Sequence, residues 1–546
     1  MQGVGPGLFF GGGIAPSAEP ASGCIRTFGR CHPQDGGFSH GRSGPVDNHK
    51  EEGMMAARMY GMVCGLLFVW AGTVWGADTA RITQLAGTVH TDLHRLVKER
   101  KMKIADAVTQ QKAFLLRQAE VKEVKQLRGN NLMVHFKDGN ELLMLLGEDR
   151  LGSADTITIA QAQQDVLKPV PQVIIPEREV NRDVLQRLLP CAPKSNKALI
   201  FDCLEDDANV VSPKIWTQVK SDLESLGYTV TTKLNNNANL ANAALIDDGE
   251  YGVVLMRGHG GDMGGDFGFL VRPWYTSYPP ANSGYTGTVR ASAYNHAAGA
   301  TQFGYIITGS FSSSYWNNKA FPSTIFFLES CHGADPGALP GMPTWTTNHG
   351  ASVWLGWNES VSFNCGDNGT DLFFQKMKEQ ASVGDAVAAV YATGCRPPEL
   401  VAFPNSRGRC QLAVWKSDPN ETSVIDARDF KLIRLVSDGS RLYSTITFYG
   451  APSFDEFFFY ADTGGTAAAE VLVKCRPGSF DVYKQTSPGL FTNKVHSGTP
   501  SISGNSYSIS VPWNTSYGTA SQVKVWLYDM TGRDRLPDSG SVTLKK

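Results

Sequence analysis

The sequence predicts an α/β domain with a mostly parallel sheet flanked by helices, preceded by a small α+β region and followed by an all-β sandwich. Between residues 197 and 394, short apolar runs alternate with amphipathic helical segments. This alternation is typical of parallel strands joined by crossover helices. A mixture of helical and strand periods precedes this part, and from about Ser423 only short alternating segments follow.

Length and composition set the limits for this interpretation. The chain has 546 residues, of which 42% are hydrophobic, so two to four domains with large cores are expected. The formal net charge of −2 gives no indication of a nucleic-acid partner or of an anionic membrane surface. Plentiful aromatic residues argue against a largely disordered chain.

The N-terminal residues are interpreted in two parts. Residues 1–53 are rich in Gly, Pro, Ser and His without a hydrophobic period, so we expect them to be disordered or untranslated. Residues 54–77 combine a short basic start, an apolar core and small residues near Gly76, the pattern of a secretory signal peptide. Translation would then start at Met54 or Met55.

This signal predicts export. The mature chain is expected to begin near Ala77 and to be secreted, periplasmic or on the cell surface, with no stable membrane insertion once the signal is removed. A membrane anchor is the alternative, because Met59 to Ala77 carries no charge and reaches the lower length limit for a span.

Residues 78–180 form the predicted α+β region. Apolar residues recur at helical spacing up to about Gln126, and a hairpin is expected to turn at Asp138-Gly139. Several prolines between residues 169 and 176 then mark a linker. A small unit between a signal peptide and a larger domain suggests a propeptide, and an unrelated N-terminal binding domain is the alternative.

Residues 181–422 form the predicted α/β domain. We expect strands at 198–204, 227–232, 251–257, 324–328 and 351–357 and helices at 213–226, 370–380 and 382–392. Residues 262–322 are expected to form a long loop with a short strand near Tyr305, and loops of this length usually shape a site.

The last part, residues 423–546, is the predicted β-sandwich. Short alternating segments are expected at 432–436, 443–448, 456–461, 470–474, 506–511 and 523–528. Their spacing and the turn residues between them favour a sandwich of immunoglobulin-like type.

Two of the predicted parallel strands end in reactive side chains flanked by glycine. One reads Tyr251 to Arg257 and continues into Gly258-His259-Gly260; the other ends in Glu329-Ser330-Cys331-His332-Gly333. Parallel strands would place His259 and Cys331 together at the carboxyl end of the sheet, where α/β proteins bind ligands. A cysteine nucleophile needs such a base, and glycine lets a substrate approach the backbone.

The order, spacing and strand context of these motifs resemble the caspase-like (clan CD) cysteine peptidases, the group of caspases, legumain, gingipains and clostripain. The resemblance covers about Lys197 to Gly394. It implies that Cys331 is the nucleophile, that His259 is the general base and that the N–H groups of Gly260 and Cys331 hold the oxyanion. The tripeptide Glu329-Ser330-Cys331 is similar to the corresponding motif of legumain, whereas the arrangement of the flanking elements is closer to that of gingipains.

The expected function is therefore that of a secreted cysteine endopeptidase made as a zymogen, with protein or peptide substrates. A legumain-like transpeptidase has the same nucleophile and is one alternative. A non-catalytic surface binding protein with a caspase-like domain is the other. The sequence leaves the preferred residue before the scissile bond and the oligomeric state open.

Glu329, Trp357, Asp367 and Asp262 are further candidates for the substrate pocket. Asp262 and Asp367 are expected in loops near the site, where one of them could face a basic substrate side chain. For Trp357, the resemblance implies that residues after its strand help to build the pocket. No cofactor is expected to be required, and no residues have the spacing of a zinc site. Asp202, Asp206 and Asp207 are the only candidates for a structural calcium ion.

Cysteine usage agrees with export. Seven cysteines follow the signal, and an odd number leaves one free, for which Cys331 is the natural candidate. Cys395 and Cys410 are close enough in sequence to close a short loop.

Overall fold

The structure is a computed structural model of the chain. It describes residues 79–146, 191–207, 215–280, 283–285, 287–295, 301–337, 339–393, 398–404, 410–419, 428–464, 469–529, 534–537 and 541–545. The expected signal peptide and the proline-containing linker lie outside these residues. Within them, no helix combines the length and the apolar character needed to cross a membrane.

A six-stranded sheet forms the centre of the α/β part, in the order β13-β12-β11-β6-β4-β5. All neighbours are parallel except β12 and β13. The strands are β4 (Lys197–Asp202), β5 (Thr229–Leu234), β6 (Val253–Arg257), β11 (Ile325–Glu329), β12 (Val353–Trp357) and β13 (Leu400–Phe403). The five parallel strands lie where the sequence predicted them, and the antiparallel edge strand β13 was not predicted.

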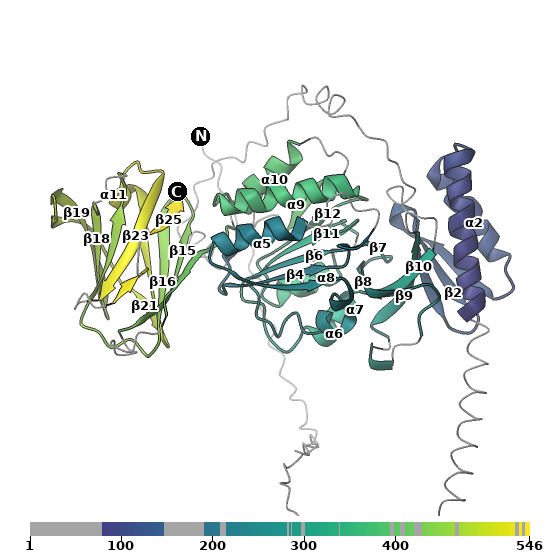
Figure 1. The fold of residues 1–546 in the computed structure, drawn as a ribbon, viewed down its shortest axis with the longest axis horizontal. Coiled ribbons are helices and arrows are strands. Elements are labelled where there is room, and N and C mark those ends of the chain that lie inside the picture. Colours follow the sequence, from purple (N-terminus) through teal and green to yellow (C-terminus); the bar gives the residue numbers. More distant parts are fainter. Residues whose placement is uncertain are drawn as a thin grey trace, which may run out of the picture. The chain divides into compact units, whose positions relative to one another are not determined.

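Helices cover both faces of this sheet (Figure 1). One face carries α5 (Ile215–Ser225), α9 (Phe363–Lys378) and α10 (Val383–Tyr391), and the other carries α6 (Leu240–Ala243), α7 (Gly309–Tyr315) and α8 (Met342–Asn348). Alternate residues of β11 serve the two cores: Ile325 and Phe327 pack on one side, Phe326 and Leu328 on the other. This explains the continuous apolar run of that strand.

Part of the predicted long loop at residues 262–322 is regular structure: it forms strands over Phe267–Tyr275, Val289–Asn295 and Thr301–Ile307, followed by the helix α7. It contributes to a second sheet in the order β1-β2-β3-β9-β10-β8-β7. Its strands are β1 (Val121–Gln126), β2 (Leu132–Phe136), β3 (Glu141–Leu145), β7 (Gly260–Asp262), β8 (Phe267–Tyr275), β9 (Val289–Asn295) and β10 (Thr301–Ile307). Glycine and tyrosine in this stretch suggested a loop, but cross-strand pairing decided otherwise.

The N-terminal region shares this second sheet. The hairpin predicted at Asp138-Gly139 is confirmed, since β2 and β3 pair antiparallel around it. A helix over residues 79–94, a short π-helical turn η1 (Arg95–Glu99) and α2 (Ile104–Leu116) pack against the hairpin. Strand β3 then pairs in parallel with β9. The sequence suggested a region set apart from the α/β domain, and the structure joins them by a continuous hydrogen-bonded sheet.

Two antiparallel sheets follow and share one core. The first has the order β14-β15-β16-β22-β21 and the second β20-β19-β18-β17-β23-β24, with β25 also on β23. Their strands are β14 (Val414–Ser417), β15 (Phe430–Ser437), β16 (Arg441–Phe448), β17 (Phe457–Asp462), β18 (Val471–Arg476), β19 (Ser479–Ser487), β20 (Leu490–Gly498), β21 (Ser501–Ser503), β22 (Ser506–Pro512), β23 (Gln522–Asp529), β24 (Arg535–Leu536) and β25 (Val542–Lys545). All six predicted strands are present, and the long hairpin β19–β20 was missed because its exposed residues lack an apolar alternation.

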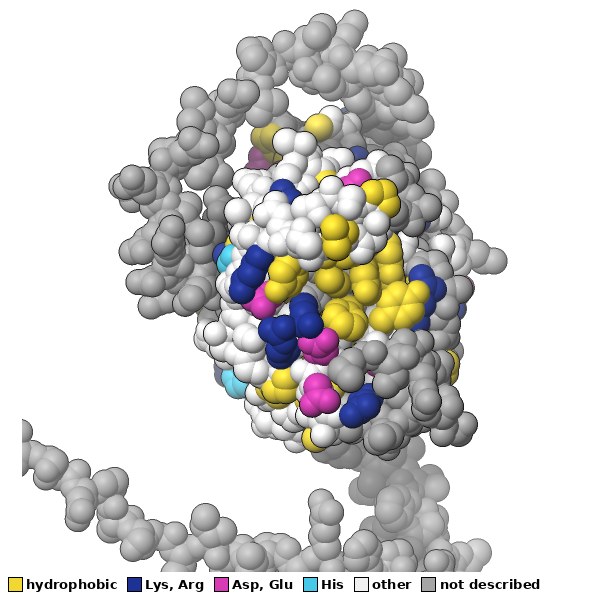
Figure 2. Space-filling view, turned by 90° about the vertical axis from the view of Figure 1, so that its left-hand side faces the viewer, with side chains coloured by type: hydrophobic (Ala, Val, Ile, Leu, Met, Phe, Trp, Pro, Cys, Tyr) yellow, Lys and Arg dark blue, Asp and Glu magenta, His cyan; other side chains and the backbone are white. Residues whose placement is uncertain are grey.

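The outer face of the second sheet carries aromatic side chains. Tyr460 on β17 lies opposite Trp526 on β23, with parallel rings whose centroids are 6.0 Å apart. Phe458 and Tyr528 form the next pair along the same strands. Figure 2 faces the end of the molecule where β18 and β19 lie in Figure 1, and it shows hydrophobic side chains grouped beside charged ones.

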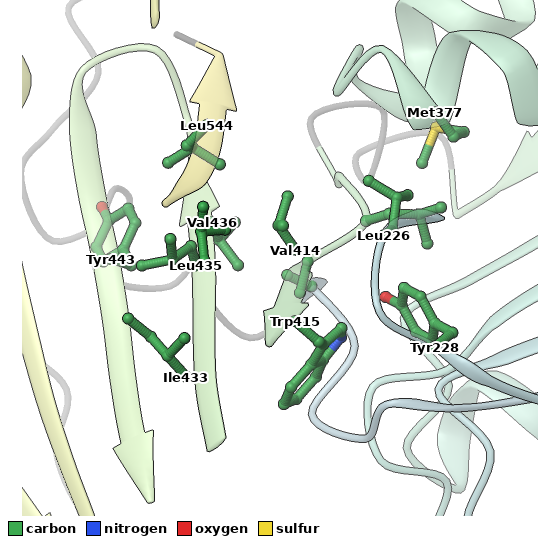
Figure 3. Close-up of a cluster of buried hydrophobic side chains, with 14 of the residues drawn as sticks. Leu226, Tyr228, Met377, Val414, Trp415, Ile433, Leu435, Val436, Tyr443 and Leu544 are labelled. Atoms are coloured by element: carbon green, nitrogen blue, oxygen red, sulfur yellow. The ribbon is translucent and has the colours of Figure 1, made fainter. Parts of the chain in front are cut away.

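The α/β core continues into the sandwich core without a break. Leu226 and Tyr228, which lie just before β5, pack near Val414 and Trp415 of β14, and β15 follows on the far side (Figure 3). The backbone N–H of Trp415 donates to the carbonyl of Leu226 at 2.7 Å. Since β14 already belongs to a sandwich sheet, that sheet begins before the predicted boundary at residue 423.

We predict that Gly227→Ala destabilises the chain more than an ordinary glycine substitution in a turn. Gly227 has φ +84°, and a Cβ there would lie 2.0 Å from the carbonyl oxygen of Trp415. The left-handed conformation alone costs about 1–3 kcal/mol for a residue with a Cβ. Gly489→Ala is the matched control, because Gly489 has φ +76° and open space around it. Urea unfolding of both variants checks this, and equal losses would contradict it.

Candidate active site

The register of two parallel strands brings the predicted catalytic pair together. Arg257 at the end of β6 lies opposite Glu329 at the end of β11. His259 lies two residues after Arg257, and Cys331 lies two residues after Glu329. The two residues therefore occupy equivalent positions just beyond the ends of the paired strands. Both residues line one cavity with about 280 Å³ of empty space, part of which is open to solvent. The structure thus places both side chains on the same cavity, at the carboxyl end of the parallel strands.

The cavity is lined by residues from four places in the chain. Besides His259 and Cys331, it is lined by Leu204 after β4, by Gly258, Glu329 and Ser330 beside the pair, and by Val361, Ser362, Phe363 and Gly366 at the start of α9. Ser362 caps α9, its hydroxyl accepting from the N–H of Cys365. The carboxyl edge of the sheet and a helix N-terminus thus form the walls of this cavity.

His259 is buried and held by a carboxylate that the sequence did not single out for this role. Its Nε2 lies 3.2 Å from Oδ2 of Asp207, and both side chains are less than 5% exposed. Aromatic rings surround the imidazole, with centroids at 4.6 Å for Tyr294, 5.6 Å for Phe363 and 6.0 Å for Trp274. Only the fold brings Asp207 to His259, because 52 residues separate them in sequence.

Cys331 lies against the segment that leads into α9. The N–H of Val361 points at its Sγ at 3.4 Å, and the Val361 carbonyl is 3.6 Å from the same sulfur. The following turn is tied down by hydrogen bonds from the N–H of His332 to Glu359 and from the indole N–H of Trp354 to Gly333. His332 itself contacts Asp335 and Ser360 through its two ring nitrogens.

Gly260 is sterically required beside the pair. A Cβ at this position would lie 2.1 Å from the hydroxyl oxygen of Ser330 and 2.8 Å from the ring of Phe267. The His-Gly motif therefore has a packing reason here that is independent of any substrate.

A buried ion cluster lies directly behind the cavity. The guanidinium of Arg257 donates to Glu329 at 2.8 Å, to Asp202 at 3.0 Å and to Asp367 at 2.6 Å. Thr370 of α9 donates to the second oxygen of Glu329 at 2.7 Å. The cluster thereby joins the ends of β4, β6 and β11 to α9.

One cation among three carboxylates leaves negative charge to be neutralised. Burial raises the pKa of Glu329 well above its usual value, opposed by Arg257 and reinforced by Asp367. Burial also raises the pKa of Asp202, again opposed by Arg257. A proton on Glu329 halves the excess negative charge of the cluster, from −2 to −1, and so lowers the cost of burying it.

The four predicted pocket residues lie in different surroundings. Glu329 lines the cavity, whereas the carboxylate of Asp367 binds Arg257 inside the cluster. Trp357 is buried, and a Cβ on Gly369 would meet its ring. Asp262 accepts hydrogen bonds from the backbone N–H groups of Gly264, Gly265 and Arg128.

The three carboxylates suggested for calcium point to three different partners. Asp202 binds Arg257, Asp206 binds Arg272, and Asp207 contacts His259. Across the described ranges, no group of three or more His, Cys, Asp or Glu side chains is arranged to hold a metal ion.

The disulfide state of the cysteines agrees only partly with the expectation from the sequence. Cys331 is not disulfide-bonded, as predicted, and the same is true of Cys191, Cys203, Cys410 and Cys475. The suggested loop between Cys395 and Cys410 is therefore wrong. Cys365 in α9 is disulfide-bonded.

Comparison with known proteins adds a structural likeness. No family model and no curated protein matches the chain. A solved structure that does match is the complex of Porphyromonas gingivalis RgpB pro- and mature domains, at 9% sequence identity and a TM-score of 0.27. The match covers 68% of this chain and 75% of that one. At this level of similarity, the functional argument rests on the geometry of the site itself.

We predict opposite outcomes for two changes in the ion cluster. Arg257→Met removes the cation that pairs with three buried carboxylates and should cost about 3–5 kcal/mol of folding free energy. Glu329→Gln mimics the protonated acid and should be tolerated. Because the pKa of Glu329 is raised in the folded state, its contribution to stability is complete below the ordinary glutamate pKa and is lost as the pH rises through the folded-state value.

The measurement is the free energy of unfolding between pH 4 and pH 9, with the exposed Glu224→Gln as control. Glu329→Gln should flatten the decline of stability toward high pH, and Glu224→Gln should not. The same slope in all three proteins would contradict a protonated Glu329.

Proposed function

We propose that the chain is a secreted cysteine endopeptidase of the caspase-like type, made as a precursor and acting through an acyl-enzyme. One observation carries the proposal: the matched ends of β6 and β11 place His259 and Cys331 on one cavity, with Asp207 bound to the imidazole. A nucleophile, a base and a carboxylate that orients the base are the parts that acyl transfer requires.

In the proposed mechanism, His259 takes the proton of the Cys331 thiol, and the thiolate attacks the scissile carbonyl carbon. The tetrahedral oxyanion is held by the N–H groups of Gly260 and Cys331. As the C–N bond breaks, His259 returns the proton to the leaving amine. Water, deprotonated by His259, then cleaves the thioester and releases the acid. Asp207 keeps the imidazole oriented through both steps.

The substrate side chain before the scissile bond would enter the cavity beside Glu329. Of the buried ion cluster, Glu329 lines the cavity, and in its protonated form it would offer both a hydrogen-bond donor and an acceptor there. Such a surface suits a side chain that both donates and accepts hydrogen bonds. Trp357 would support this wall, and Asp262 would shape the entrance through the turn it stabilises.

The precursor proposal rests on contacts of the N-terminal region with the site. Nη1 of Arg128 lies 2.6 Å from Asp335, four residues after Cys331, and its backbone N–H donates to Asp262 at 3.2 Å. Processing would occur in the proline-rich linker, from Pro169 to Arg182. No cofactor is required in this mechanism, and a calcium ion would have a structural role only.

We predict that Cys331→Ala abolishes peptide hydrolysis while the fold is retained, because the residue is small and lies beyond the strand end. His259→Ala should lower kcat by at least about 100-fold, the usual contribution of a positioned general base. Asp207→Asn should lower kcat less than His259→Ala, since it keeps the side chain but weakens the orientation of the imidazole.

Hydrolysis of a peptide library is the measurement, with Cys203→Ala as the thiol control. Cys203 is buried, its Sγ pairs with the carbonyl of Ala238, and burial raises its pKa, so it should not react. A folded Cys331→Ala protein with wild-type activity would refute the mechanism.

We also predict that the exported chain begins near Ala77. Removal of a signal peptide after residue 76 or 77 leaves the helix over residues 79–94 at the new N-terminus. N-terminal sequencing of protein recovered outside the cytoplasm tests this. A recovered chain that starts upstream of Met54 would disprove both the signal and the start-site proposal.

A further inference from the structure

The N-terminal region completes the sheet that supports His259. Strand β3 pairs in parallel with β9, from Leu142 opposite Ala291 to Leu145 opposite Tyr294. On its other side, β9 pairs with β10. If residues 79–146 left, β9 would become an edge strand with a row of unpaired backbone donors and acceptors.

Two apolar cores cross this junction, one on each face of the sheet. On the first face, Leu142 and Met144 of β3 pack with helix residues of the N-terminal region and with Ala293 and Phe303 of β9 and β10. All four are fully buried. Separation would expose this face to water.

The second face leads to the site. Leu143 and Leu145 of β3 pack in one cluster with Leu270, Tyr294 and Ile306. All five side chains are fully buried. Tyr294 is therefore covered by the N-terminal region on the side away from the cavity.

Tyr294 connects this cluster to the catalytic base. Its ring centroid lies 4.6 Å from that of His259, and Trp274 packs on its edge at 5.0 Å. Its hydroxyl donates to Gln302 on β10. Because close-packed interiors transmit small displacements, the position of β3 influences the position of the imidazole.

The N-terminal region does not fill the cavity. Among the described residues, every one that lines it lies between Leu204 and Gly366, and none belongs to residues 79–146. The side chain of Arg128 is 60% exposed, so its contact with Asp335 lies at the surface. A segment that covers the support of the base but leaves the cavity open is suited to hold the site in place.

We propose that residues 79–146 remain bound in the active enzyme and that Tyr294, covered by Leu143 and Leu145, is a positioning residue for His259. The proposal rests on the peptidase function proposed above. It replaces release of the N-terminal region by retention: the precursor is cut between residues 147 and 190, and the two fragments stay together through β3 and β9.

The first test uses the full chain with a specific protease site introduced between residues 147 and 190. After cleavage, size-exclusion chromatography at neutral pH should show both fragments in one peak, with hydrolytic activity kept. Elution of residues 79–146 as a separate species under these conditions would overturn the proposal.

The second test compares neighbouring leucines on opposite faces of β3. Leu143→Ala loosens the cover of Tyr294, whereas Leu142→Ala loosens the other core, and both should lower the melting temperature. Only Leu143→Ala should lower kcat, by roughly ten- to a hundredfold, the effect of a displaced catalytic group, with KM little changed. Tyr294→Leu should act like Leu143→Ala, and Tyr294→Phe, which keeps the ring, should stay near wild type.

A third measurement separates positioning from a general loss of stability. It is the pH dependence of Cys331 alkylation by iodoacetamide, followed by mass spectrometry, which a merely structural role of Tyr294 would not change. It reports on the thiol–imidazole pair and needs no peptide substrate. Leu143→Ala and Tyr294→Leu should change this profile, and Leu142→Ala should not. Identical profiles in Leu142→Ala and Leu143→Ala would overturn the proposal.

These readouts separate the two proposals. If wild-type protein hydrolyses no peptide, the peptidase function fails, but fragment retention and the alkylation profiles still decide the role of residues 79–146. If hydrolysis is present and the profiles coincide, only the positioning role fails.

Discussion

The guanidinium of Arg257 fixes where three strands of the central sheet end, and the geometry of the site depends on it. It bonds to Asp202, Glu329 and Asp367 with no exposure to water. A buried ion cluster contributes little to net stability, because desolvation opposes the attraction between its charges. Its effect is to lock the ends of β4, β6 and β11 to α9, so that His259 and Cys331 leave the sheet at one level.

Around this cluster, small residues allow the close contacts that a side chain would prevent. Gly260 leaves room for Ser330 beside the nucleophile. Gly356 of β12 does the same for the turn after Cys331, since a Cβ there would lie 2.6 Å from the backbone of Gly333. The turn that carries the thiol is therefore positioned by backbone packing from a neighbouring strand, which is a stiffer support than long side chains provide.

The apparent domains of this chain are not independent bodies. The sandwich core continues into the α/β core around Trp415, and the N-terminal hairpin continues the sheet of β7 to β10. Burial on both faces of β3 connects the N-terminal region with the surroundings of the base. Stability and site geometry are thereby coupled, because loosening either junction disturbs strands that end at or next to the cavity.

The sequence by itself determined the local features. Apolar runs that are too short for helices predicted the five parallel strands, and their reactive, glycine-flanked ends predicted the pair His259 and Cys331. Six sandwich strands followed from period-2 alternation. These features are local, since hydrophobic periodicity and turn residues act within a few positions of the chain. The missed hairpin β19–β20 lacks that signal on its exposed side.

Only the tertiary structure decided the long-range pairings. The segments Phe267–Tyr275, Val289–Asn295 and Thr301–Ile307 form strands because neighbouring strands and the N-terminal hairpin complete their hydrogen bonds, and no local pattern specifies such partners. The same holds for charges. Asp202, Asp206 and Asp207 form one acidic group in the sequence, but in the structure each contacts a different partner. Sequence proximity places carboxylates near each other, but the direction of each side chain and the nearest buried base or cation depend on which strands lie alongside.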